Sequence, residues 1–212
     1  MPLLRLAPVF KQVLGMRTCM ENIESVGLKV GKLWYPVTVL GYGRRLGVWM
    51  QGCGRRCPGC ISPELQPPEG GTEIGISEIE ALMEGREPVD GLTVSGGEPF
   101  DQPEGLLALV RWFADTYGDD ILIYTGYTLE ELHGMNSGTV EEILTAVSVL
   151  VDGSYVEENN DGIGLRGSSN QRIHVMKNRN RYSDAQNCSR KVQCVFTGKR
   201  VWIIGIPPKP ER

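Results

Sequence analysis

The chain has 212 residues, of which 41% are hydrophobic and 23% charged, as in an ordinary globular domain. Its net charge of −4 gives no chain-wide basic field for nucleic acid, and no apolar run approaches the roughly 20 residues of a membrane helix. The N-terminus also lacks the apolar core of a signal peptide. We therefore expect a cytoplasmic protein that binds neither membranes nor nucleic acid, in which cysteines more often bind metal than form disulfides.

The chain order of strands and helices predicts an α/β fold. Residues 1–25 match nothing later in the chain, so we expect an extension there, disordered or wrongly started, before one domain at 26–206 and a tail at 207–212. From Val37 onward, apolar strands alternate with glycine or polar turns and amphipathic helices, the pattern of a parallel sheet. Strands are predicted at 46–50, 91–95, 121–125 and 147–151, with later candidates at 173–176 and 201–206; helices are predicted at 77–85, from an Asp101 cap to Tyr117, and from Thr128 and Thr139.

Three cysteines follow the first of these strands. Cys53, Cys57 and Cys60 form a C-x3-C-x2-C spacing within eight residues. Thiolates bind both zinc and iron–sulfur clusters, but structural zinc normally has a fourth Cys or His ligand. Three thiolates on a four-iron cube instead leave one iron open for a substrate or cofactor. Zinc stays an alternative if a distant residue folds back; the candidates are Cys19, Cys188, Cys194, His133 and His174, which we otherwise expect to be incidental thiols and surface histidines.

A second motif ends the strand at 91–95. Gly96 and Gly97 would let the backbone approach a ligand closely, and Glu98 follows at the carboxyl end of a parallel strand, where α/β folds bind ligands. Alone, this could be an ordinary strand-to-helix turn. Thr125 and Asp152 end later strands on the same edge and are candidates for a cofactor contact, although Asp152 could equally be a solvated turn residue.

Together the two motifs resemble the radical S-adenosylmethionine superfamily. More narrowly, residues 35–175 are similar to the activating proteins of glycyl radical enzymes, in particular those of anaerobic ribonucleotide reductase. The segments that carry the resemblance are Gly52 to Cys60, Ser95 to Pro99, Tyr124 to Thr128, Val149 to Gly153 and Arg166 to Gln171.

The resemblance implies a fold, two cofactors and partners. The fold would be an incomplete parallel (β/α)6 barrel with its site at the carboxyl ends of the strands. The three cysteines would hold a [4Fe-4S] cluster as metal ligands and catalytic groups, and S-adenosyl-L-methionine would chelate the open iron. Its reductive cleavage would give a 5′-deoxyadenosyl radical that takes a hydrogen from a glycine of a large partner enzyme, with the electron coming from an external donor such as flavodoxin or ferredoxin. The groups at the cofactor would be Gly96, Gly97 and Glu98 at the amino end, and the backbone of Gly59, Cys60 and Ile61 beside the adenine.

The sequence after the third cysteine departs from this family. The activases commonly have an aromatic residue and asparagine there, whereas this chain has Ile61-Ser-Pro-Glu64, so the partner surface would differ. One alternative function is radical modification of another protein or peptide. A second, of a different class, is a metal-binding or redox-sensing module without catalysis. The donors of Arg166 to Gln171 would suit a phosphate-like group or the backbone of a partner.

Overall fold

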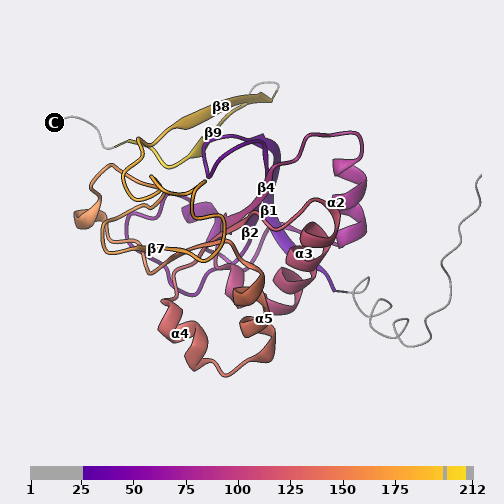
Figure 1. The fold of residues 1–212 in the computed structure, drawn as a ribbon, viewed down its shortest axis with the longest axis horizontal. Coiled ribbons are helices and arrows are strands. Elements are labelled where there is room, and N and C mark those ends of the chain that lie inside the picture. Colours follow the sequence, from indigo (N-terminus) through magenta and orange to yellow (C-terminus); the bar gives the residue numbers. More distant parts are fainter. Residues whose placement is uncertain (1–25, 198–199, 209–212) are drawn as a thin grey trace, which may run out of the picture.

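The computed structural model describes residues 26–197 and 200–208 (Figure 1). The predicted extension at 1–25, Cys19 and the last four residues of the predicted tail lie outside the described residues. No helix of the described residues is long and apolar enough to cross a membrane.

A seven-stranded sheet forms the centre of the molecule, in the order β3-β1-β2-β4-β5-β6-β7, and β8 and β9 form a separate hairpin. The strands are β1 (Leu28–Val37), β2 (Arg45–Met50), β3 (Thr72–Ile74), β4 (Gly91–Gly96), β5 (Ile121–Tyr124), β6 (Val149–Asp152), β7 (Arg172–Val175), β8 (Val192–Thr197) and β9 (Arg200–Gly205). The helices are α2 (Ile76–Met83), α3 (Pro103–Thr116), α4 (Leu129–Gly134) and α5 (Gly138–Ala146), with 3-10 turns η1 (Pro63–Leu65), η2 (Pro99–Asp101) and η3 (Glu157–Asn159).

Four of these strands, β2, β4, β5 and β6, are parallel, whereas β1, β3 and β7 pair antiparallel at the two edges. The described fold is therefore mixed α/β, and the prediction of about six parallel strands is wrong for this part of the chain. The reason lies in the connections, because a parallel pair needs a crossover long enough to return to the same end. The seven residues between β1 and β2 cannot provide one, and the segment from β6 to β7 contains only η3.

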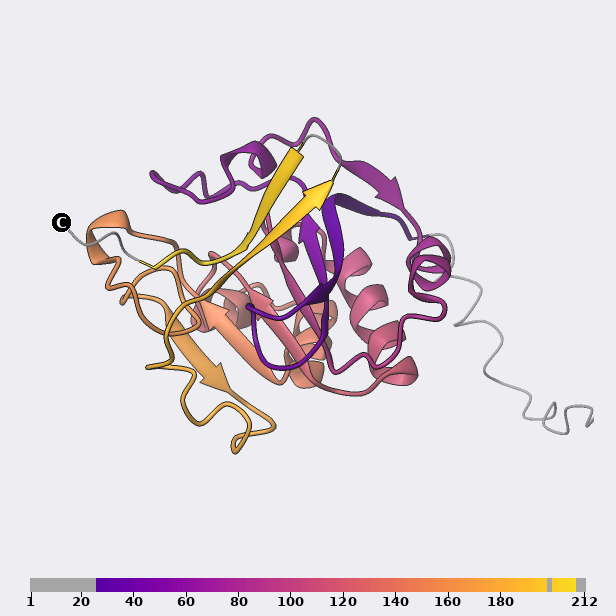
Figure 2. The ribbon, with the colours of Figure 1, turned by 90° about the horizontal axis from the view of Figure 1, so that it is seen from above.

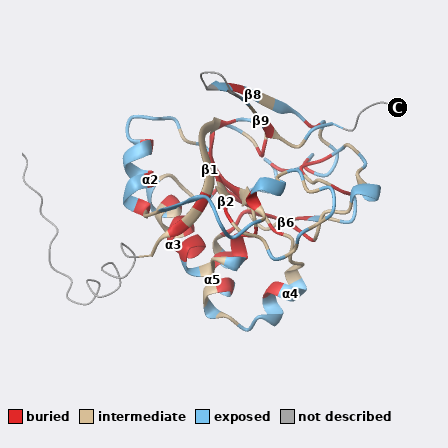
Figure 3. Ribbon diagram, turned by 180° about the vertical axis from the view of Figure 1, so that it is seen from behind, coloured by how far each residue is buried: buried red, intermediate tan, exposed pale blue. Residues whose placement is uncertain are grey.

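The helices cover one face of the sheet, and α3 supplies much of the packing. Leu106, Val110 and Phe113 of α3 are buried against strand residues such as Val48 and Val94, as their helical spacing predicted (Figure 3). The β8–β9 hairpin lies against the other face (Figure 2), where Val195 and Ile204 pack on Val37 and Leu40.

A buried cation joins the sheet to the C-terminal part of the chain. Arg45 begins β2 and is completely inaccessible to solvent. Its guanidinium donates to the hydroxyl of Thr93 at 2.7 Å, to Asp120 Oδ1 at 3.0 Å and to the hydroxyl of Tyr182 at 3.1 Å. A buried charge is tolerated when it is paired and hydrogen-bonded in this way. Arg45 lies at the amino end of β2, so this polar cluster is separated by the length of the strand from the cysteines that follow Met50.

Candidate functional site

The three cysteines lie on one loop that leaves the carboxyl end of β2. The loop is fixed at its start, because Gly52 N donates to Leu65 O at 2.8 Å and Cys53 N to Gln66 O at 3.0 Å. Cys60 N donates to Cys57 O at 3.3 Å, which closes a tight turn between the second and third cysteines. All three thiols are half-buried. The backbone thus places the three cysteines on one short loop.

Cys53 is the first of the three cysteines after β2. Burial raises the pKa of this thiol; the N–H groups of Arg55 and Arg56 oppose the rise, and the carboxylates of Glu98 and Asp101 add to it. The first cysteine thus lies within electrostatic reach of Glu98, which follows it by 45 residues in the chain.

No group of three His, Cys, Asp or Glu side chains in the described residues is arranged around a single metal ion. Such a group would bind a single metal ion, whereas the protein ligands of an iron–sulfur cluster bind different iron atoms. The described candidates for a fourth zinc ligand lie on other elements. Cys194 is exposed on β8, His133 contacts Glu141 at 2.7 Å, and His174 lies beside Asp152.

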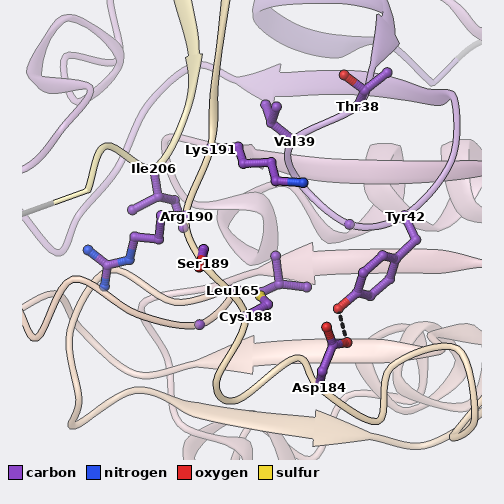
Figure 4. A pocket seen from close by; sticks show the side chains of 12 residues that line it. Thr38, Val39, Tyr42, Leu165, Asp184, Cys188, Ser189, Arg190, Lys191 and Ile206 are labelled. Atoms are coloured by element: carbon purple, nitrogen blue, oxygen red, sulfur yellow. Dashed lines mark hydrogen bonds between the residues drawn. The ribbon is translucent and has the colours of Figure 1, made fainter.

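Cys188 lines a cavity of about 320 Å³ at the amino end of β2 (Figure 4). Tyr42, from the loop before β2, donates its hydroxyl hydrogen to Asp184 across this cavity. The cysteine loop leaves the opposite end of β2, so the cavity is not part of the candidate site. Cys188 therefore gives no fourth ligand there.

The two glycines at the end of β4 lie directly against the start of the cysteine loop. A Cβ atom on Gly97 would clash with the carbonyl oxygen of Gly52, and one on Gly96 would be 2.5 Å from Met50 N. Gly97 N donates to Met50 O and Glu98 N to Gly52 O, both at 2.8 Å. The close approach that these glycines allow is therefore, in this structure, an approach to another backbone segment. The N–H groups of Gly97 and Glu98 already donate to the protein, so a ligand here would meet carbonyl oxygens rather than these N–H groups.

Glu98 joins the ends of β4 and β5 and is almost fully buried. Oε1 accepts from the Thr125 hydroxyl at 2.8 Å and from Phe100 N at 3.1 Å, and Oε2 accepts from Gly126 N at 2.7 Å. Burial raises the pKa of Glu98 to about 7, although these three donors act to lower it. Glu98 and Thr125, two residues predicted for one site, are therefore in direct contact.

Asp152 ends β6 and is 1% exposed, so the alternative of a solvated turn aspartate is wrong. Its carboxylate accepts from Leu129 N at 2.7 Å and from Arg172 Nε at 3.0 Å, and His174 Nε2 lies 3.1 Å away. Burial alone would raise the pKa of Asp152, but these partners outweigh it and the pKa is lowered. His174 is half-buried rather than fully exposed, with 25% of its side chain open to solvent, so the prediction of a surface histidine holds only in part.

The backbone predicted to lie beside an adenine is at the surface of the cysteine loop. Gly59 lies against the carboxylate of Glu157 in η3, and Ile61 is 61% exposed. The segment after β6 therefore borders Gly59, the residue before the third cysteine, whereas Ile61 is open to solvent.

The hydrogen-bond donors of Arg166 to Gln171 bond largely to groups of the connection between β6 and β7. Gln171 Oε1 accepts from Gly167 N at 2.8 Å, and Gln171 Nε2 donates to Gly153 O at 2.7 Å. Ser168 is fully buried and accepts from Val156 N at 3.2 Å. The loop thus holds together the connection between β6 and β7, rather than presenting a set of free donors to a phosphate-like group.

Asp101 has a role that the sequence did not reveal. It was expected to cap the helix that follows, but Gln102 is the N-terminal cap of α3. Instead, the Asp101 carboxylate accepts from Gly54 N at 3.1 Å and from the Tyr127 hydroxyl at 2.9 Å. The one signal available was its position, three residues after Glu98, because a contact with Tyr127 has no local pattern in the sequence.

A family model described as a 4Fe-4S single cluster domain matches residues 39–174. The match includes the cysteine loop, the glutamate motif, and the ends of β5 and β6. The loop of three thiols and this match define the class, a protein with a single four-iron four-sulfur cluster.

Similarity to known proteins defines the class of this protein more narrowly. The anaerobic ribonucleoside-triphosphate reductase-activating protein of Escherichia coli (strain K12) is 33% identical over 155 residues, which are 68% of this chain and 97% of the relative. The corresponding protein of Salmonella typhi is 32% identical with the same coverage. The pyruvate formate-lyase-activating enzyme of Clostridium pasteurianum is 32% identical over 69% of this chain and 58% of its own length. Among solved structures, QueE from Escherichia coli matches with a TM-score of 0.44 and 14% identity, over 54% of this chain and 59% of QueE.

The chain belongs to the family of anaerobic ribonucleoside-triphosphate reductase-activating proteins. It is accordingly a radical S-adenosylmethionine enzyme, and its cofactors are a [4Fe-4S] cluster and S-adenosyl-L-methionine. The donor set of the structure fits such a cluster, because three half-buried thiols on one loop are soft ligands suited to iron.

Proposed function

We propose that this chain generates a glycyl radical on a partner enzyme of the anaerobic ribonucleotide reductase type. One observation carries the proposal furthest: the loop of three cysteines is joined to the glutamate motif by the hydrogen bond from Glu98 N to Gly52 O, at 2.8 Å. The ligands for a cluster and the groups for its cofactor thus lie at one edge of the sheet. The names of the relatives support the partner class, since each of them activates another enzyme.

Cys53, Cys57 and Cys60 would hold the cluster through their three thiolates. With three protein ligands, the cluster would have one iron free to bind the amino and carboxylate groups of the cofactor. When bound, the cluster and cofactor together supply a one-electron reductive cleavage that yields a hydrogen-abstracting radical. An external donor such as flavodoxin or ferredoxin would provide the electron.

The amino end of the cofactor would lie against the end of β4. An ammonium group has donors and no acceptor, so it needs oxygen atoms. The N–H groups of Gly97 and Glu98 already donate to Met50 and Gly52, which leaves carbonyl oxygens of Gly96 and Gly97 as suitable partners. An ammonium bound here would favour the ionised form of Glu98, whose oxygens accept from Thr125 and Gly126.

The remaining predicted residues would border the cofactor. The backbone of Gly59, Cys60 and Ile61 would lie beside the adenine at the open side of the loop. Thr125 would fix the end of β5 through its contact with Glu98. Asp152 would have a positioning role, because its carboxylate accepts hydrogen bonds from Leu129 N and Arg172 at the same edge of the sheet.

The larger architecture fits a partner that closes the site. We assign residues 26–206 to one domain with a tail at 207–212, and regard the four parallel strands as part of an incomplete barrel of the radical S-adenosylmethionine type. The cysteine loop is open to solvent at Ile61. A radical at this site needs protection from water and side reactions, which a large protein substrate would provide.

The test is the radical itself. Protein reconstituted with iron and sulfide without oxygen is reduced, mixed with S-adenosyl-L-methionine and an anaerobic ribonucleotide reductase, and examined by electron paramagnetic resonance. Wild type and the control Cys194→Ala, which alters an exposed thiol on β8, should give a glycyl radical signal, whereas Cys53→Ala should give none. Cofactor cleavage by wild type without a radical on any reductase would contradict the assigned partner and favour another protein or peptide as substrate.

A further inference from the structure

The segment between the first two cysteines is held from outside the cysteine loop. Gly54 N donates to Asp101 Oδ2 at 3.1 Å, and the other oxygen of Asp101 accepts from the Tyr127 hydroxyl at 2.9 Å. Burial raises the pKa of Tyr127 to about 12, and its bond to Asp101 adds to the rise, so the hydroxyl stays a neutral donor near pH 7. Asp101 therefore joins the cysteine loop to the turn between β5 and α4.

Arg55 makes a second connection between the same elements. Its guanidinium carbon lies 4.0 Å from the centre of the Tyr127 ring, within the range of a cation–π contact. Its Nη2 donates to Glu131 Oε2 at 2.8 Å, and that same oxygen accepts from Thr128 N in the cap of α4. The stack requires the absence of a side chain at residue 126, because a Cβ on Gly126 would be 2.9 Å from Arg55 Cγ.

The side chain of Arg55 is thus held in one position, unlike that of its neighbour Arg56. The side chain of Arg55 is 24% exposed and is held by an aromatic face and a carboxylate. Arg56 is exposed, and among the described residues its side chain forms no hydrogen bond or ion pair. A cluster gains one negative charge on reduction, and a nearby cation stabilises that form more when it is ordered and partly shielded from water.

We propose that Arg55, Tyr127, Asp101 and Glu131 form a clamp that fixes the Cys53–Cys57 segment and holds a guanidinium beside the cluster, so that the cluster is easier to reduce. Tyr127, Asp101 and Glu131 are in this role positioning residues, because they act through Arg55 and the backbone of Gly54. The proposal rests on the proposed function, since it concerns the cluster of that site.

The first test is the midpoint potential of the cluster in reconstituted protein, followed by electron paramagnetic resonance during a redox titration. Arg55→Gln should lower the midpoint, so that the ratio of reduced to oxidised cluster at a fixed potential falls about tenfold, or about 59 mV for one electron. Arg56→Gln removes the same charge one residue away and should shift the midpoint by less than half as much. Arg55→Lys, which keeps the charge, should restore more than half of the loss. Equal shifts for Arg55→Gln and Arg56→Gln, or no shift for either, would overturn the proposal.

The second test separates the clamp from the charge. Tyr127→Phe keeps the ring under Arg55 but loses the bond to Asp101, so amide exchange at Gly54 in the cluster-loaded protein should become about fivefold faster. Unchanged exchange at Gly54 would contradict the clamp. Failure of the proposed function would look different, because wild type would then bind no cluster, leave the cofactor uncleaved, or cleave it without forming a glycyl radical on the partner. Failure of the clamp instead leaves a wild-type cluster that is normal and variants that match it.

Discussion

Two buried carboxylates, Glu98 and Asp152, determine the geometry of the candidate site at the level of single residues. Glu98 follows β4 and Asp152 ends β6, and the carboxylate oxygens of both accept hydrogen bonds from other groups of the protein. Glu98 holds the end of β5, while Asp152 holds the start of α4 and the antiparallel strand β7. Buried carboxylates with several donors are rigid, so they fix the strand ends between which a cofactor would bind.

Asp152 predicts an acid-sensitive contribution to stability. Its pKa is lowered in the folded protein, so its contribution is present above the unfolded value of about 3.9 and is lost as the pH falls below it. Asp152→Asn should cost about 2 kcal/mol at pH 7, since it weakens charged hydrogen bonds to a buried group, and the loss should shrink towards pH 3. Urea denaturation of cluster-free protein at both pH values measures it.

Glu130 is the matched control for this prediction. It pairs with the same Arg172, but its side chain is 70% exposed. Exposed ion pairs contribute little to stability, so Glu130→Gln should leave the urea midpoint nearly unchanged. If both substitutions cost the same, or if the cost of Asp152→Asn did not depend on pH, the interpretation of Asp152 would be incorrect.

At the scale of elements, the contact between the end of β4 and the start of the cysteine loop is the most demanding. Gly97→Ala would push a methyl group into the carbonyl of Gly52. We expect a loss of about 2 to 3 kcal/mol in the free energy of unfolding and a lower iron content after reconstitution, because the loop must move away from β4. Chemical denaturation and iron analysis measure the two effects.

Gly138→Ala tests whether the cause is this contact or simply the loss of a glycine. Gly138 begins α5, and a Cβ there would have no neighbour within 4 Å. Alanine should therefore stabilise the protein by up to about 0.5 kcal/mol and leave the iron content unchanged. Normal stability and iron content in Gly97→Ala would show that the β4 contact does not hold the loop.

The parallel strands could be predicted from the sequence because their burial is nearly continuous. The strands predicted at 46–50, 91–95, 121–125 and 147–151 are short, largely apolar runs bounded by turns. Each overlaps an observed strand, although the last of these strands begins only at Val149. The strand β1 was missed because it contains Gly31 and Pro36 and has register irregularities after Val30 and Trp34. Its residues are mostly half-buried on both faces, so no simple alternation marks it.

The site could be predicted where local motifs carry it and not where distant residues meet. The cysteine spacing and the Gly-Gly-Glu motif indicated the loop and the strand end, and the order of parallel strands indicated that Glu98 and Thr125 would be near each other. The contacts of Arg55 and Asp101 with Tyr127 join residues 26 to 72 positions apart, and only the folded chain brings them together.

At the scale of the whole molecule, the two ends of the parallel strands carry different groups of residues. The carboxyl ends carry the cysteine loop and the glutamate motif, while the amino end of β2 carries Arg45 and its partners. The hairpin β8–β9 lies beyond the residues matched by the family model and covers the sheet face opposite the helices. Its outer face exposes the apolar side chains of Val192, Phe196, Val201 and Ile203. The described chain thus extends beyond the matched residues by β1 on one side and by the β8–β9 hairpin on the other.

The central claim is that three cysteines of one loop hold a cluster that cleaves S-adenosyl-L-methionine. Its most direct test is 5′-deoxyadenosine, measured by mass spectrometry after anaerobic reconstitution, reduction and addition of the cofactor. Wild type and Cys188→Ala, whose thiol lies at the opposite end of β2, should both form it, whereas Cys57→Ala should form none above background. If wild type bound metal but formed no more 5′-deoxyadenosine than Cys57→Ala, the site would be a metal-binding module without this catalysis.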